Sequence, residues 1–227
     1  MRLPWKGRRE LSGALMDGLW GVFGSLEEVR RGADVQFGMG DIAMTGYSVF
    51  HMQSPSFLEA QRRLQSWCGG NNARAFFGIG RIPGDEQTRN VLDRVETGRL
   101  LPAFDAAHKE MEGRGLLKGF DFLDGKRLVA LDGTWYFCSE KIGCGNCTTR
   151  TRSDGTVERY HSAVTPAVVS PDMGGLAVPL RPEFIVPQDG SEKQDCEINA
   201  AKRWLELCAG LYNREGKGGA VLLGDDL

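Results

Sequence analysis

The sequence contains no apolar run that approaches the roughly 20 residues that a helix needs to span a bilayer. Its N-terminal segment also lacks the apolar core of a secretory signal peptide. Neither sign of charge is in large excess, because 28 Lys and Arg face 30 Asp and Glu, for a net charge of −2. We therefore expect a cytoplasmic protein without a membrane partner, and the net charge by itself does not indicate a nucleic-acid partner.

Cysteine and histidine are both scarce. The six Cys residues have irregular spacing, unlike the disulfide framework of a small secreted domain, and a reducing compartment disfavours disulfides. We therefore interpret the cysteines as free thiols or metal ligands. Cys144 and Cys147 form a Cys-x-x-Cys pair, and Cys138 and His161 could complete a Cys₃His zinc site. The alternative is a hairpin tip with two free thiols, for which Asn146 is a suitable turn residue.

The remaining composition is that of an ordinary globular protein, with 41% hydrophobic and 26% charged residues. Its length leaves room for one large or two small domains. The first part of the chain has the period of helices, and from Lys126 onward the pattern changes to that of strands. We expect a mainly helical region over residues 1–122 and a mixed region over residues 123–227. The predicted fold class is α+β or α/β.

Helix signals mark three segments of the first region. Residues 56–67 place apolar side chains on one face, with Ser56 as a candidate N-cap. A second helix is predicted to open within residues 83–85 and to end at Gly98, and a third covers residues 102–113. Residues 32–46 are rich in glycine and have no clear period, so we predict a loop or a poorly packed connection there.

The second region alternates strand and helix signals in an order that implies a crossover. Strand-like runs occur at 128–137, 160–169, 176–180 and 183–186. A helix follows, with Asp195 as the candidate N-cap and an apolar stripe of Ile198, Ala201, Leu205, Cys208 and Tyr212. A short apolar strand at 220–224 comes last. A helix that returns the chain to a strand beside the first predicts a mixed sheet with a right-handed connection.

Two of these strands end in carboxylates. Asp132 follows the apolar run 127–131, and Asp225-Asp226 follows the run 220–224. A carboxylate at the end of a buried strand costs free energy unless it meets a metal or a cation. If the two strands are neighbours, Asp132 and Asp225 would begin a divalent-metal site. The alternatives are that Asp132 belongs to an Asp-Gly turn and that Gly-Asp-Asp is only a polar strand end.

Several separate motifs occur in the order typical of one family. They are Leu131-Asp132-Gly133-Thr134, Lys141-Ile142-Gly143-Cys144-Gly145-Asn146-Cys147, Tyr160-His161, Gln188-Asp189-Gly190-Ser191-Glu192-Lys193-Gln194-Asp195-Cys196-Glu197, Ala200-Ala201-Lys202-Arg203 and Leu223-Gly224-Asp225-Asp226-Leu227. With these motifs, residues 75–227 resemble a DDE-type insertion-sequence transposase, a family with an RNase H-like catalytic domain. Residues 1–70 resemble the helical N-terminal region of that family loosely.

The resemblance implies DNA transposition, with Mg²⁺-dependent phosphodiester hydrolysis and strand transfer at insertion-sequence ends. Asp132 matches the first catalytic and metal-binding Asp and Asp225 the second, with Asp226 as the alternative. The third ligand of the family is a Glu on a later helix, which has no counterpart before Leu227. We therefore expect an incomplete RNase H-like domain, truncated before the third acidic residue and inactive alone. Two Mg²⁺ ions would activate the attacking group and stabilise the leaving oxygen, and carboxylates are suitable ligands for them.

The resemblance also implies double-stranded DNA as the partner, a homo-oligomer, and a bacterial, nucleoid-associated location. Lys193, Arg81 and Arg89 are candidates for DNA contact, because Lys and Arg neutralise phosphates. The alternative for each is a solvated surface charge. A second interpretation of the whole chain is a non-catalytic DNA-binding or oligomerising remnant that modulates an intact transposase. A third is a zinc-stabilised binding module.

Overall fold

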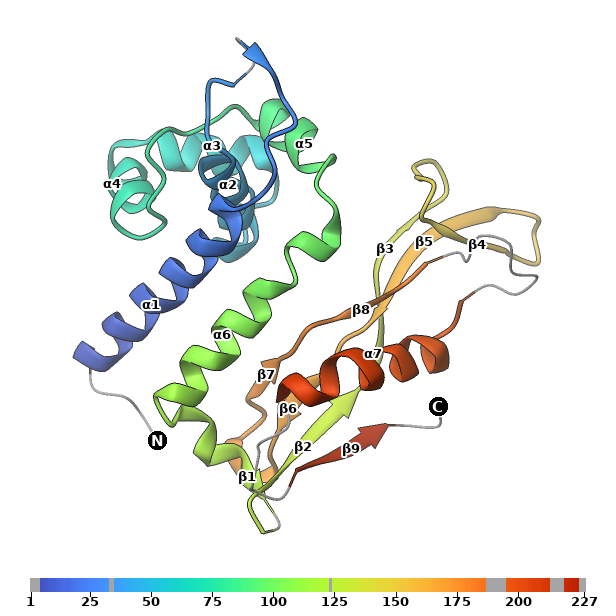
Figure 1. Ribbon diagram of the computed structural model, residues 1–227. Coiled ribbons are helices and arrows are strands. Elements are labelled where there is room, and N and C mark those ends of the chain that lie inside the picture. The colour runs from blue at the N-terminus through green and yellow to red at the C-terminus, as the bar shows by residue number, and fades with distance from the viewer. Residues whose placement is uncertain (1–4, 33–34, 123, 187–194, 213–218, 225–227) are drawn as a thin grey trace. The chain divides into compact units, whose positions relative to one another are not determined.

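The computed structural model describes residues 5–32, 35–122, 124–186, 195–212 and 219–224 (Figure 1). The chain divides into two compact units, Met1–Glu110 and Met111–Leu227. The first is helical and the second combines strands with a helix, so the fold is a mixed α+β fold with a helical N-terminal region, as the sequence predicts. Within the described ranges, no helix is both long and apolar enough to cross a membrane.

The helical unit is built from short helices around one apolar core. Its elements are α1 (Trp5–Gly24), α2 (Met39–His51), α3 (Phe57–Gln65), α4 (Trp67–Ala75), α5 (Asp85–Leu92), the 3-10 turn η2 (Thr97–Arg99) and α6 (Pro102–Gly113), which continues past Glu110. Ile42 and Met44 of α2 and Leu64 of α3 are fully buried in this core. The central helix of the unit is therefore α2.

The loop predicted at residues 32–46 is wrong for its second half, which forms the start of α2. Nearly every side of this helix is buried, so its sequence has no polar face and no amphipathic period to recognise. Its glycines permit close packing. A Cβ on Gly40 would lie 2.1 Å from the ring of Trp20, and a Cβ on Gly46 would lie 2.5 Å from Leu92.

Local signals locate the other helices of this unit well. The Ser56 hydroxyl accepts a hydrogen bond from the Glu59 amide, so the predicted N-cap of α3 is confirmed. The helix α6 spans the predicted residues 102–113. In contrast, α5 ends at Leu92 rather than at Gly98, because the chain tightens into turns there. Val95 packs against the core from that turn. Its apolar side chain, at helical spacing from Val91 and Leu92, is therefore partly buried without a longer helix.

The second unit contains two sheets and one long helix. Its elements are η3 (Leu116–Phe120), β1 (Asp121–Phe122), β2 (Lys126–Leu131), β3 (Gly133–Ser139), β4 (Thr148–Thr151), β5 (Val157–Val164), β6 (Ala167–Val169), η4 (Pro171–Met173), β7 (Ala177–Pro179), β8 (Glu183–Ile185), α7 (Glu197–Tyr212) and β9 (Ala220–Gly224). One sheet has the order β1-β2-β6-β7, and β9 also pairs with β2; the other has the order β3-β5-β4, and β8 pairs with β5. Leu117 and Phe120 belong to the core of this unit, which therefore includes residues before the expected boundary at 122/123.

The strands predicted at 128–137 and 160–169 are each divided between the two sheets. The first divides at Asp132, between β2 and β3, and the second at Thr165-Pro166, between β5 and β6. The Thr165 amide donates to the Asp132 carbonyl oxygen at 2.8 Å. This hydrogen bond joins the two positions at which the predicted strands divide. Pro166 has no amide hydrogen to donate to a ladder, which suits a break between strands. Asp132 therefore lies where the paired strands pass from one sheet to the other.

The crossover helix α7 covers the sheet that contains β2 (Figure 1). Ala200 and Trp204 are fully buried against Val129, Leu131 and Val168. The buried face includes Ala201, Cys208 and Tyr212 of the predicted stripe, but Ile198 is 45% exposed. The buried face of α7 is therefore rotated from the predicted apolar stripe toward Trp204, whose large ring is buried in the core.

The start of α7 also differs from the prediction. The helix begins at Glu197, two residues after the predicted N-cap, Asp195. The Asp195 carboxylate accepts hydrogen bonds from Arg203 at 3.0 and 2.7 Å, and the same guanidinium donates to Glu183 of β8 at 2.7 Å. Burial alone would raise the pKa of Asp195, but the bonds from Arg203 lower it below its ordinary value. This charge network ties α7 to β8.

Candidate functional site

The strands β2 and β9 lie side by side, are parallel and are in register (Figure 1). Their pairs run from Arg127 with Ala220 to Leu131 with Gly224. Asp132 follows directly after the last β2 residue of this ladder and is exposed. In the sequence, Asp225 and Asp226 follow Gly224, but both lie outside the described residues. The described part of this arrangement is therefore a parallel strand pair, with α7 as its crossover and an exposed carboxylate at the end of β2.

A second carboxylate lies beside this strand end. Glu197 is the first residue of α7, and a Cβ placed on Gly133 would lie 2.2 Å from its carboxyl carbon. The absence of a side chain at Gly133 thus leaves the space that Glu197 occupies, and Gly133 directly follows Asp132 in the sequence. The sequence interpretation assigned no role to Glu197. An acidic residue at the first turn of a crossover helix, with a glycine after the strand-end Asp, is the signal that could have identified it.

The predicted ligands Cys144, Cys147 and His161 come together at the β3–β4 loop and strand β5. The two sulfur atoms lie 3.8 Å apart, and each lies 3.3 Å from Nε2 of His161. Two Zn–S bonds of about 2.3 Å at the tetrahedral angle separate their sulfurs by about 3.8 Å. The Cys144 amide also donates to the Cys147 sulfur at 3.2 Å. This cluster could hold a metal ion.

The fourth predicted ligand, Cys138, does not join the cluster. In the antiparallel pair of β3 and β5, Cys138 lies opposite Tyr160, whereas His161 lies opposite Phe137. Neighbouring strand residues point to opposite faces of a sheet, so Cys138 and His161 are on different faces. The Cys138 sulfur lies 3.6 Å from Glu158. Burial, and then the negative charge of Glu158, raise the pKa of the Cys138 thiol.

An aromatic side chain that the sequence did not indicate covers the cluster. The register of β3 against β5 shifts between Trp135 and Phe137, so Tyr136 is the extra residue of an irregularity. Its ring stacks on His161, with centroids 5.7 Å apart and an interplanar angle of 15°. Burial, followed by the charges of Cys144 and Cys147, raises the pKa of Tyr136. A register shift of this kind has no marker in the local sequence.

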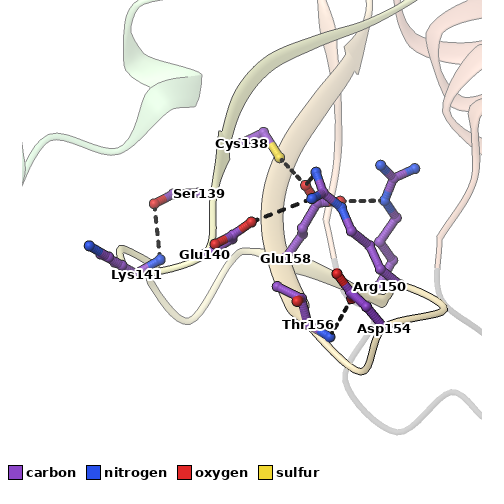
Figure 2. A network of polar contacts seen from close by, with 9 residues as sticks. Cys138, Ser139, Glu140, Lys141, Arg150, Asp154, Thr156 and Glu158 are labelled. Atoms are coloured by element: carbon purple, nitrogen blue, oxygen red, sulfur yellow. Dashed lines mark hydrogen bonds and ion pairs between the residues drawn. The ribbon is translucent and has the colours of Figure 1, made fainter.

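The opposite face of the same sheet carries a network around a buried carboxylate (Figure 2). Glu158 accepts a hydrogen bond from Nε of Arg150 at 2.6 Å and another from Arg152, and its side chain is only 4% exposed. Arg152 also lies 3.4 Å from Glu140. The hydrogen bond from Arg150, together with that from Arg152, lowers the pKa of Glu158. Glu158 therefore stays charged and holds two guanidinium groups.

The structure describes two of the three residues predicted to contact DNA, Arg81 and Arg89. Arg81 is exposed and donates to the Gln36 carbonyl oxygen at 2.8 Å. Arg89 is also exposed and lies 3.3 Å from Asp85, one turn away on α5. Lys193 lies outside the described residues.

No protein-family model, curated protein or solved structure matches the chain. Two arrangements then bear on function. One is the pair of parallel strands that ends beside Asp132 and Glu197. The other is the cluster of two thiols and one imidazole on the neighbouring sheet.

Proposed function

We propose that this chain carries the metal-binding centre of a DDE-type transposase, which hydrolyses and joins DNA phosphodiesters at insertion-sequence ends with Mg²⁺. The observation that carries the proposal is the parallel register of β2 and β9. In the resembling family, the first strand provides one Asp and the strand after the helix provides the next. Here Leu131 pairs with Gly224, and the residues that follow them in the sequence are Asp132 and Asp225.

The chemistry of the donor atoms fits the proposed metal. Mg²⁺ prefers oxygen ligands, and Asp132 with Glu197 offers two described carboxylates at the same end of the strand pair. When bound, two such ions activate an attacking hydroxyl and stabilise the leaving oxygen. The exposed carboxylate of Asp132 would bind the metal, while Glu197 would add negative charge beside Gly133. Two further parts of the proposal come from the family resemblance and not from this arrangement. They are double-stranded DNA as the partner and a homo-oligomer as the assembly.

Metal binding at Asp132 tests this proposal directly. Paramagnetic Mn²⁺ should broaden the amide resonances of Gly133 and Thr134 in the full chain, and Asp132→Asn should remove the effect. Asp124→Asn is the matched control, because Asp124 is an exposed turn residue with φ of 59°, a conformation that Asn also tolerates. Broadening that persists in Asp132→Asn would overturn the proposal. So would Mg²⁺-dependent nicking of plasmid DNA that survives this substitution.

A second function is favoured by the cluster of Cys144, Cys147 and His161, which we propose to be a zinc site that stabilises the sheet β3-β5-β4 as a binding module. Thiolate and imidazole ligands suit Zn²⁺, and a metal here would join the β3–β4 loop to β5. Three protein ligands leave one coordination position for water or another donor. This proposal does not depend on catalysis at Asp132.

Elemental analysis tests the zinc proposal. The purified chain should contain about one zinc per molecule, as expected for a structural site, and Cys147→Ser should lose it. Cys138→Ser is the matched control, because Cys138 lies on the opposite face of the sheet and should leave the zinc content unchanged. A chain without zinc after metal-replete purification, or equal loss in both variants, would contradict the assignment.

A further inference from the structure

Three side chains form a stack on one face of the sheet β3-β5-β4. The cluster of Cys144, Cys147 and His161 lies on the opposite face. The rings of Trp135 and Tyr160 are 4.3 Å apart at 15°. The Arg150 guanidinium carbon lies 4.7 Å from the centroid of the Trp135 ring. The stack is open to solvent, since Trp135 is 45% exposed and the Arg150 side chain is 49% exposed. An exposed tryptophan and arginine held together in this way form an ordered surface that includes a guanidinium group.

The strand register explains why these residues meet. Arg150 lies opposite Glu158, and Tyr160 lies opposite both Thr148 and Cys138. Residues two apart on a strand share a face, so Glu158 and Tyr160 point to the same side of β5. Arg150 can therefore contact the carboxylate and extend over the Trp135 ring at the same time. A cation over the face of a tryptophan ring is a favourable contact.

The guanidinium of Arg150 is fixed in two ways. Its Nε donates to Glu158 at 2.6 Å (Figure 2), and its plane packs against Trp135. Among the described residues, its two terminal nitrogens have no hydrogen-bond partner. Glu158 also binds Arg152, which in turn lies 3.4 Å from Glu140, so Arg152 has a second carboxylate partner and the terminal nitrogens of Arg150 stay open to a ligand. An ordered guanidinium loses less conformational entropy when it binds an anion.

We propose that this surface, Arg150 with Trp135 and Tyr160, binds the phosphate backbone of double-stranded DNA. The terminal nitrogens of Arg150 match the two oxygens of a phosphodiester, which arginine binds in bidentate fashion. Phosphate contacts orient a protein on a duplex without reading its sequence. The proposal rests on the proposed function for the identity of the nucleic acid. It adds a contact surface on the sheet β3-β5-β4, separate from the strand end at Asp132.

A metal held by Cys144, Cys147 and His161 would support this surface from the other face of the sheet. Cys147 immediately precedes β4, the strand that carries Arg150, and His161 lies on β5 next to Tyr160. A metal bound by both residues would hold the register that pairs Arg150 with Glu158. Order in this part of the sheet is therefore coupled to the position of the guanidinium.

The salt dependence of DNA binding tests the proposal. The affinity of the full chain for a short duplex of arbitrary sequence would be measured by fluorescence anisotropy over a series of KCl concentrations. Arg150→Gln should weaken binding equally for different sequences and reduce the slope of log K against log salt by about one. Trp135→Ala keeps the charge but removes the ring that orients it, and should weaken binding with a smaller change in slope. Arg150→Lys should restore part of the slope.

Matched variants separate the possible outcomes. Arg159→Gln removes the same charge from β5 on the opposite face, and should leave the slope unchanged. An unchanged slope in Arg150→Gln, or an equal loss in both arginine variants, would overturn the proposal. Tighter binding to polyglutamate than to DNA would indicate an acidic protein partner instead and would also overturn it. Asp132→Asn distinguishes the two proposals: it should lose Mn²⁺ binding but retain the wild-type salt slope.

Discussion

Glu158 is a charged residue whose protonation should influence the stability of the second unit. Arg150 and Arg152 lower its pKa below the ordinary value of 4.5, so the folded protein holds the ionised form more strongly than the unfolded chain does. The resulting stabilisation is fully present above about pH 4.5 and is lost as the pH falls through the lower, folded value. Glu158→Gln should therefore be less stable than wild type at pH 7, and the difference should shrink in acid.

Urea unfolding followed by circular dichroism at neutral and acid pH would measure this difference. Glu140→Gln is the control, because Glu140 is half-exposed and lies 3.4 Å from Arg152. Exposed ion pairs contribute little to stability. A stability difference for Glu158→Gln that is independent of pH would contradict the assigned role.

Gly133 is a residue whose substitution should affect metal binding more than stability. A Cβ at this position would contact the flexible end of the Glu197 side chain, which can move away. We expect Gly133→Ala to change the free energy of unfolding by no more than about 0.5 kcal/mol, the range of ordinary surface substitutions, but to weaken Mn²⁺ binding beside Asp132. Thermal unfolding and Mn²⁺ line broadening on the same sample would compare the two effects. Unchanged Mn²⁺ affinity would mean that Glu197 does not contribute to the site.

At the scale of elements, the corner between α3 and α4 depends on one glycine. Ser66 alone separates the helices; its hydroxyl donates to the Arg63 carbonyl at 2.6 Å and accepts from the Gly69 amide at 3.2 Å. A Cβ on Gly69 would lie 1.7 Å from the Arg63 carbonyl oxygen, a backbone atom that cannot easily move. Gly69→Ala should destabilise the helical unit by about 1–3 kcal/mol, the usual range for overpacking. Gly70→Ala, with its nearest contact at 3.7 Å, is the control for chemical denaturation.

The second element to test is β4, which the proposed metal would join to β5. A structural metal contributes its binding free energy to folding. Chelation should therefore increase amide hydrogen exchange in Thr148–Thr151, while exchange in α7 and β2 should change little because their core is separate from the cluster. Mass spectrometry of exchange with and without chelator would measure this. Equal protection of β4 in both samples would contradict a structural role for the metal.

At the scale of the whole molecule, β9 offers an apolar surface for self-association. Leu222 and Leu223 are 44% and 42% exposed, and among the described strands β9 pairs with β2 alone. Exposed apolar strands at a sheet edge promote association. We expect concentration-dependent oligomers in sedimentation velocity experiments, and Leu222→Lys should shift the protein toward the monomer. A monodisperse wild-type monomer at high concentration would contradict this expectation.

Much of the fold follows from local sequence signals. The N-cap at Ser56, the helix from Pro102, the strand-like runs after Lys126 and the crossover to 220–224 each depend on neighbouring residues, and such patterns can be recognised without knowing the fold. The spacing of Cys144 and Cys147, with His161 as a candidate, also predicted the three residues of the cluster that could hold a metal ion. Local periodicity and motif spacing determined these features because they are properties of short segments.

Only the tertiary structure decided the features that depend on register and packing. The helix α2 has no amphipathic period because it is buried on nearly all sides. The division of a strand at Asp132 and the opposite faces of Cys138 and His161 follow from pairing with β5. Glu197 meets Gly133, and Arg150 meets Trp135, across long sequence separations. A shift of one residue in strand pairing would reverse the faces, and local sequence does not determine that register.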